Sequence, residues 1–161
     1  MPTDFARDTG NFPRSTASIA GHPIHPMLVP FPIAFFVATL ACDTMFLRTA
    51  NPEWIGATMW LLGAGLAMAG LAALAGVTDL LGDRRIARLG DTWLHAVGNV
   101  LIVSIEALNL YIRYQTPTAN LMPIGALLSL LAVMGLLFTG WKGGKLVYRH
   151  RIGMRRDDGP I

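Results

Sequence analysis

Residues 54–81 read WIGATMWLLGAGLAMAGLAALAGVTDLL, a run of 28 residues in which Asp79 is the single charged side chain. A helix needs about 20 apolar residues to cross the hydrocarbon core of a bilayer, so this run predicts a transmembrane helix. Three similar apolar stretches cover residues 28–47, 92–112 and 122–141. Short connections between sequential helices favour antiparallel neighbours. The predicted fold class is therefore all-α, a four-helix transmembrane bundle in up-down-up-down order.

The composition agrees with a protein that faces lipid. Of the 161 residues, 53% are hydrophobic and 14% are charged, against roughly 25% charged in a soluble domain. The net charge of +3 does not indicate a nucleic-acid partner, because the basic residues flank the apolar stretches and no nucleic-acid motif is present. The lone Cys42 excludes an internal disulfide framework. The partner that the composition predicts is the lipid bilayer.

The basic residues also predict an orientation. Eleven of the thirteen Lys and Arg residues fall in the amino-terminal tail, the second connection and the carboxyl-terminal end; the other two are Arg48 and Arg113. The positive-inside rule then puts both termini in the cytoplasm. We expect a flexible polar tail over residues 1–20, without a signal peptide, a transmembrane domain over 21–148 and a basic cytoplasmic tail over 149–161.

A polar stripe follows the third predicted helix. Its members fall within an arc of about 80° at roughly 100° per residue: His95, Asn99, Glu106, Asn109 and Arg113. Such a stripe either supplies hydrogen bonds between helices or forms a path or site for protons, electrons or an ion. Asp43, near the outer end of the first helix, is the predicted partner of Arg113, because Glu106 is about 10 Å from Arg113 along the axis.

The segment GHPIHPMLVPFPI, residues 21–33, contains two histidines, His22 and His25, among four prolines. Proline removes an N–H donor and restrains the residue before it, so the segment predicts an extended or broken entry into the first helix. This entry would hold both histidines near the cytoplasmic interface. The topology brings His95 and His150 to the same side of the membrane.

Convergence of four histidines suggests a cofactor site, because imidazole is a ligand of haem iron and of transition metals. We expect His25 and His95 to approach each other and bind haem b or a transition-metal ion, with Asn99 in the same pocket. His22, His150 and Asp79 are further candidate metal ligands or supporting partners. The alternative is that the histidines are interfacial, or are neutral and bonded to Asp79 or to backbone.

Three functions therefore stay open. The first is a small haem- or metal-binding module for electron transfer near the cytoplasmic face. The second is a small proton or ion transporter or channel, and the third is a structural subunit of a membrane complex. Nothing predicts an enzyme, since no nucleophile elbow, phosphate-binding loop, dinucleotide fingerprint or His-Glu-x-x-His helix is present. The Gly- and Ala-rich second helix suits packing within one bundle or a homo-oligomer contact.

Several of these features together resemble the DUF2231 family of predicted bacterial membrane proteins. They are GHPIHPMLVPFPI, Asp43, the Gly/Ala-rich helix that ends in Asp79, His95-x-x-x-Asn99 and the closing GWKGGKLVYRHRIG. The resemblance covers about residues 20 to 154 and implies a four-helix protein of the bacterial cytoplasmic (inner) membrane. Relatives found beside iron–sulfur redox domains imply electron transfer with a redox partner protein. This chain departs from many members at Pro30, where they carry a histidine.

Overall fold

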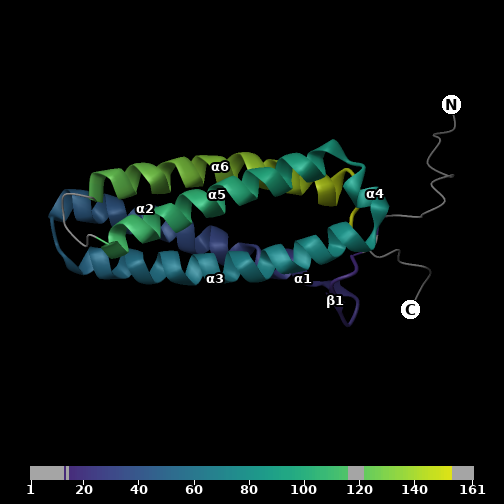
Figure 1. The fold of residues 1–161 in the computed structure, drawn as a ribbon, viewed down its shortest axis with the longest axis horizontal. Helices are drawn as coiled ribbons and strands as arrows, with labels where there is room; N and C mark the ends of the chain where they lie inside the picture. The colour runs from purple at the N-terminus through teal and green to yellow at the C-terminus, as the bar shows by residue number, and fades with distance from the viewer. Residues whose placement is uncertain (1–12, 14, 116–121, 154–161) are drawn as a thin grey trace, which may run out of the picture.

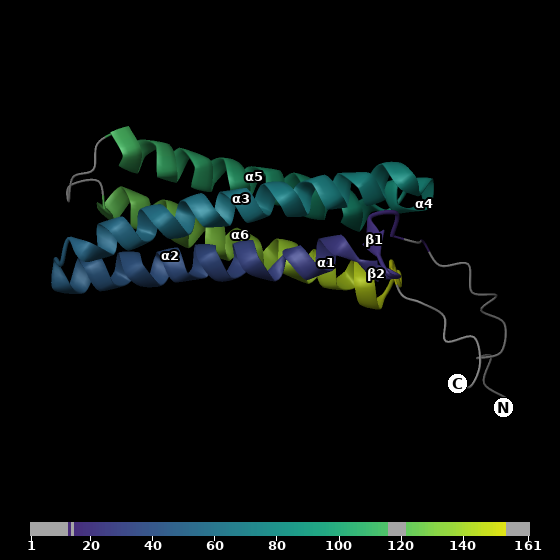
Figure 2. The ribbon, with the colours of Figure 1, turned by 90° about the horizontal axis from the view of Figure 1, so that it is seen from below.

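The computed structural model describes residues 13, 15–115 and 122–153. Four long helices dominate this part of the chain (Figures 1 and 2): α2 (Pro30–Thr49), α3 (Glu53–Gly82), α5 (Gly90–Gln115) and α6 (Met122–Tyr148). Two short helices, α1 (Ile24–Leu28) and α4 (Arg84–Ala87), stand at one end with a two-residue antiparallel pair, β1 (Ser18–Ile19) and β2 (His22–Pro23). The predicted all-α bundle of four helices is confirmed.

The long helices run antiparallel to their sequence neighbours and form a four-sided bundle (Figure 1). α2 packs against α3 and α6, and α5 packs against α6 and α3, so α2 and α5 face each other across one diagonal. The backbone N–H of Gly153 donates to the carbonyl of Pro13 over 3.0 Å, which brings the two ends of the described chain together. Both ends therefore lie at the same end of the bundle.

Each of the four helical spans found in the described residues is long and apolar enough to cross a membrane. They are Ile24–Thr49, Glu53–Gly82, Gly90–Gln115 and Met122–Tyr148. Large apolar side chains point outward along all of them, for example Val37, Trp60, Leu74, Val100 and Leu137. An exterior of this kind is stable against lipid and costly in water, so the protein is a multi-pass membrane protein in contact with the bilayer.

The entry into the first span is more helical than the sequence predicts. β2 is extended, as expected, but α1 begins at Ile24 and α2 follows at Pro30. The prolines are tolerated because Pro26, Pro30 and Pro32 occupy the first turns of α1 and α2, where the backbone N–H has no partner within the helix. The first span, predicted over about residues 28–47, therefore begins earlier, at Ile24.

The connections and tails differ from the prediction in smaller ways. The second connection contains the α4 turn, in which Asp83 caps the helix by accepting from the Arg85 N–H over 2.9 Å. α6 continues seven residues past its predicted end at residue 141. Within the predicted tail, Ser15 Oγ and the Ala17 N–H both donate to Asp79 at the end of α3. Residues 1–12, 14, 116–121 and 154–161 lie outside the described residues, so the tail boundaries stay predictions.

Candidate functional site

His25 and His95 meet across the diagonal of the bundle. Their ring centroids are 6.2 Å apart and the ring planes are 85° to each other, an edge-to-face arrangement. His25 comes from α1, which continues into α2, and His95 comes from the second turn of α5. The predicted approach of these two residues is confirmed, and we call them the histidine pair.

The two histidines are held in the same way by different helices. His25 Nδ1 lies 2.7 Å from the carbonyl oxygen of Ala72 in α3, and His95 Nδ1 lies 2.9 Å from that of Thr139 in α6. A carbonyl oxygen can only accept, so each Nδ1 carries the proton and donates. Both rings are thereby fixed in orientation, and in each neutral ring the remaining nitrogen, Nε2, bears the lone pair.

A glycine lies four residues after each acceptor and makes room for the ring. A Cβ on Gly76 would come within 3.0 Å of His25 Nδ1, and one on Gly143 within 2.9 Å of His95 Cε1. Residues four apart share one helix face, so the carbonyl at position i and the glycine at i+4 together form a seat for the imidazole. Neither seat is predictable from the sequence, because every residue type presents a backbone carbonyl.

The free nitrogens of the two rings have different surroundings. Asn99 Nδ2 lies 3.2 Å from His95 Nε2 and also donates to the His95 carbonyl over 2.8 Å, while its Oδ1 accepts from Thr139 Oγ1 over 3.3 Å. Asn99 therefore shares the pocket of His95, as expected. For His25 Nε2 there is no hydrogen-bond partner among the described residues. Both rings are only partly buried.

The other candidate ligands lie apart from the histidine pair. His22 is exposed and bonds the carbonyl of Ala20 over 3.1 Å. His150 Nε2 is 3.6 Å from Asp91, whose carboxylate also pairs with Lys142 at 2.9 Å. Asp79, as described above, binds the backbone and side chain of residues 15–17. In the part of the chain that the structure describes, no group of three or more His, Cys, Asp or Glu side chains is arranged to hold a metal ion.

A second polar site surrounds Arg113 at the opposite end of the bundle. We call it the arginine cluster: Asp43, Thr58, Glu106, Asn109, Arg113 and Ser129. Arg113 forms a two-pronged ion pair with Asp43, with Nη1–Oδ1 and Nη2–Oδ2 distances of 2.7 and 2.8 Å. The side chains are 2% and 0% exposed, so the pair is shielded from lipid. The predicted Asp43–Arg113 pairing is confirmed.

Thr58, Asn109 and Ser129 bond the ion pair directly. Arg113 also donates to Thr58 Oγ1 in α3 and to Asn109 Oδ1, each over 2.8 Å. Ser129 Oγ of α6 donates to Asp43 Oδ2 over 2.8 Å and accepts from Asn109 Nδ2 over 3.0 Å. Every long helix thus contributes to one hydrogen-bonded group, which is how charges are accommodated inside a membrane protein.

The contribution of Thr58 and Ser129 could not be seen in the sequence. Each is a small hydroxyl residue within an apolar helix, where a bond to its own backbone is the ordinary expectation. Gly125 is the other hidden member: a Cβ there would overlap Arg113 Nη2 and lie 2.9 Å from Nε. Only the packing of the helices against one another reveals these roles.

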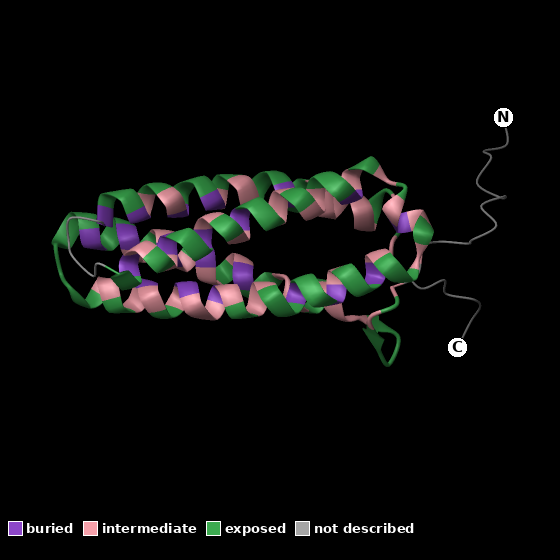
Figure 3. Cartoon of the chain, viewed as in Figure 1, coloured by how far each residue is buried: buried purple, intermediate pink, exposed green. Residues whose placement is uncertain are grey.

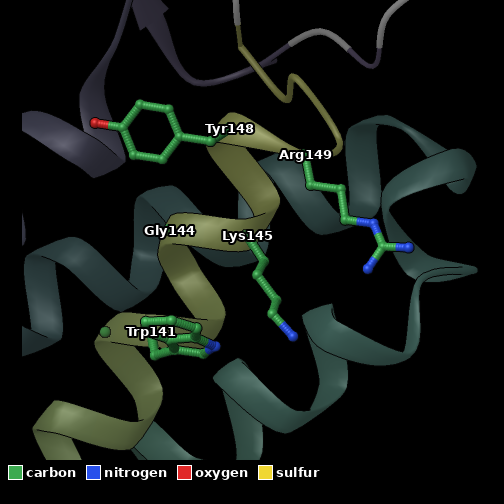
Figure 4. Close-up of a pocket in the computed structure, with 6 residues that line it drawn as sticks. Trp141, Gly144, Lys145, Tyr148 and Arg149 are labelled. Carbon is green, nitrogen blue, oxygen red and sulfur yellow. The ribbon is translucent and has the colours of Figure 1, made fainter.

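A hollow on the surface of α6 is separate from both sites (Figure 4). It is lined by Gly140, Trp141, Gly144, Lys145, Tyr148 and Arg149. Trp141 and Tyr148 are 70% and 81% exposed, which is the usual position of aromatic residues at a membrane–water interface. The hollow marks the place where α6 leaves the apolar span.

Comparison with known families agrees with this architecture. The DUF2231 family, described as predicted membrane protein, matches residues 21–156. The chain belongs to this family. The match covers the histidine pair, the arginine cluster and all four spans, so these features lie inside the family domain. No curated protein and no solved structure matches the chain.

Proposed function

We propose that the histidine pair binds haem b and that the protein is a small electron-transfer module of the membrane. The observation that carries the proposal is the pair of matched seats: each imidazole donates Nδ1–H to a helix carbonyl and leaves Nε2 as the candidate ligand atom. A second hydrogen bond that fixes tautomer and ring orientation is typical of metal-binding histidines.

The number of available ligands favours haem over a bare ion. A structural zinc site takes four protein ligands and a catalytic one takes three, whereas the described residues bring two imidazoles together and no larger group. A porphyrin supplies the other four ligands of its iron, so two histidines are sufficient. Bound there, haem would supply one-electron chemistry. A transition-metal ion that completes its shell with other ligands is the alternative.

The chain's own residues would bind and orient the group. His25 and His95, held by the carbonyls of Ala72 and Thr139, would bind the haem iron, and Asn99 would have to release His95 Nε2. The rings are only partly buried, which suits a site that exchanges electrons with a redox partner protein.

The test is a haem titration of the protein purified in mild detergent, followed by ultraviolet–visible spectroscopy and metal analysis. We expect the wild type to give the Soret band of six-coordinate, bis-histidine haem. His25→Ala and His95→Ala should each lose this spectrum, while His22→Ala, a matched control with an exposed ring, keeps it. A wild type without haem affinity would refute the proposal, as would a His25→Ala/His95→Ala double variant that binds as tightly as wild type. Stoichiometric bound metal without porphyrin would favour the ion instead.

The proposed setting is a bacterial cytoplasmic membrane with both termini in the cytoplasm. The eleven basic residues on that side support it, and the shared end of the described chain is consistent with it. The histidine pair would then lie in the cytoplasmic half of the bilayer. Reporter fusions at Ile161 should be active in the cytoplasm; a periplasmic signal there would reverse the orientation.

A further inference from the structure

Glu106 is the one member of the arginine cluster that the ion pair does not explain. Its side chain is fully buried in α5. Oε2 accepts a hydrogen bond from Asn109 Nδ2 over 2.9 Å, but among the described residues Oε1 has no hydrogen-bond partner. A buried polar atom without a partner is uncommon and indicates an interaction with something that is not a protein group.

The arginine cluster contains more buried acidic groups than basic groups. The buried charged groups of the cluster are two carboxyls, Asp43 from α2 and Glu106 from α5, and one guanidinium, Arg113 from α5. The residues that α3 and α6 contribute, Thr58 and Ser129, are neutral. With both carboxyls ionised, the cluster would carry one uncompensated negative charge.

Among the described residues, Arg113 bonds Asp43 directly but not Glu106. Its Nη1 and Nη2 bind the two oxygens of Asp43, and its Nε binds Asn109. The Asn109 amide lies between Arg113 and Glu106 and bonds both. Asp43 is therefore the acid that Arg113 neutralises. An ionised Glu106 would be an unpaired charge in a water-excluded core, which is strongly unfavourable.

We propose that Glu106 is a proton-binding site: its carboxyl holds one proton and is neutral at neutral pH, while Asp43 and Arg113 stay ionised. The proposal does not depend on haem binding, since Glu106 is eleven residues from His95 along α5. Oε1 is the oxygen that carries the proton, because Oε2 accepts a hydrogen bond from Asn109.

A proton fits this site better than a metal cation. A sodium or similar ion needs several oxygen ligands, and the nearby cluster oxygens are already engaged in the ion pair and its hydrogen bonds. Among the described residues, no group of three or more His, Cys, Asp or Glu side chains is arranged to hold a metal ion. A proton needs only the carboxyl itself.

The chain offers a clean spectroscopic test, because it contains two glutamates, Glu53 and Glu106. Glu53 is exposed at the start of α3 and bonds Asn51. Protein labelled with ¹³C-glutamate and reconstituted in detergent should show, at neutral pH, the C=O stretch of a protonated carboxyl. The band should disappear in Glu106→Gln and persist in Glu53→Gln.

Each alternative outcome overturns the proposal. Labelled wild type that shows only carboxylate bands at neutral pH would mean that Glu106 is ionised. Loss of the protonated band when choline chloride is replaced by sodium chloride would mean that the site holds a cation. Because the amide of Glu106→Gln mimics a neutral carboxyl, this variant should unfold at the wild-type temperature, and a large drop would count against neutrality. If that variant fails to fold, the band in Glu53→Gln still reports Glu106 alone.

Discussion

The arginine cluster and the histidine pair lie at opposite ends of one bundle and use the same helices differently. Both cross the α2–α5 diagonal, and on α5 the two sites are eighteen residues apart, about 27 Å along the axis. The arginine cluster is sealed: Asp43 and Arg113 are almost inaccessible, and their hydrogen-bonding groups are satisfied. The rings of the histidine pair are partly exposed, and among the described residues His25 Nε2 has no hydrogen-bond partner.

The difference shows which site supports the fold and which has spare bonding capacity. Residues coloured as buried gather at the end of the bundle that holds the arginine cluster (Figure 3). An ionised pair inside a bilayer has to be enclosed, and Arg113 and Asp43 are almost inaccessible. Imidazoles need less enclosure, because a neutral ring with one donated hydrogen bond is tolerated at partial exposure. We therefore expect mutations to separate into stability effects at one end and binding effects at the other.

The largest effect should come from Arg113→Met. It leaves Asp43 without its counterion, and removing one partner of a buried pair costs about 3–5 kcal/mol. The measurement is thermal or chemical unfolding in detergent, with Arg48→Met, an exposed arginine of α2, as the control that should change little. Equal stability of the two variants would show that the arginine cluster does not hold the bundle together.

Gly125→Ala should have the next largest effect. The new Cβ would overlap the Arg113 guanidinium, which its hydrogen bonds prevent from moving away, and overpacking of this kind costs about 1–3 kcal/mol. Gly63→Ala is the matched control, since a Cβ there meets nothing within 4 Å. The same unfolding assay compares them, and a loss in Gly63→Ala as great as in Gly125→Ala would argue against the steric explanation.

Gly143→Ala should affect binding more than stability. Its Cβ presses on His95, but a partly exposed ring can shift, and alanine regains up to about 1 kcal/mol of helix propensity. We expect near wild-type unfolding and about tenfold weaker haem binding, equivalent to about 1.4 kcal/mol. The neighbouring Gly144→Ala, where a Cβ is free of contacts within 4 Å, should bind like wild type. Identical haem titrations of the two variants would show that the seat formed by Thr139 and Gly143 does not contribute to haem binding.

Asn99→Ala should give the smallest effect. It removes a hydrogen bond to His95 Nε2 and one from Thr139, and a net loss of about 1 kcal/mol in unfolding free energy is typical. Because Nε2 becomes free, haem affinity should stay the same or increase. A complete loss of binding would instead identify Asn99 as a direct contact of the bound group.

The sequence was sufficient for the features that follow from periodicity and charge. Apolar length predicted four spans, the 3.6-residue period placed Arg113 and Glu106 on one interior face, and matching depths predicted the Asp43–Arg113 pair. Each of these depends on one helix or on the axial position of two residues, which the sequence encodes directly.

The sequence was not sufficient where side chains of one helix meet backbone of another. The seats of His25 and His95 depend on carbonyls of Ala72 and Thr139, and every residue type presents a carbonyl. The start of α1 at Ile24 was also not predicted. Proline breaks a helix in its interior, but it is tolerated in the first turn, and the sequence alone did not show where the first turn lies.

The Asp43–Arg113 pair also has a consequence for how the protein is made. The two residues are seventy positions apart, and synthesis proceeds from the amino terminus. The first span, with Asp43, therefore reaches the translocation machinery before Arg113 has been added to the chain. A lone ionised aspartate in a span costs about 2.5–3.5 kcal/mol, and the first span has no counterion for it until Arg113 arrives. Insertion of the third span therefore removes a penalty that the first span would otherwise carry alone.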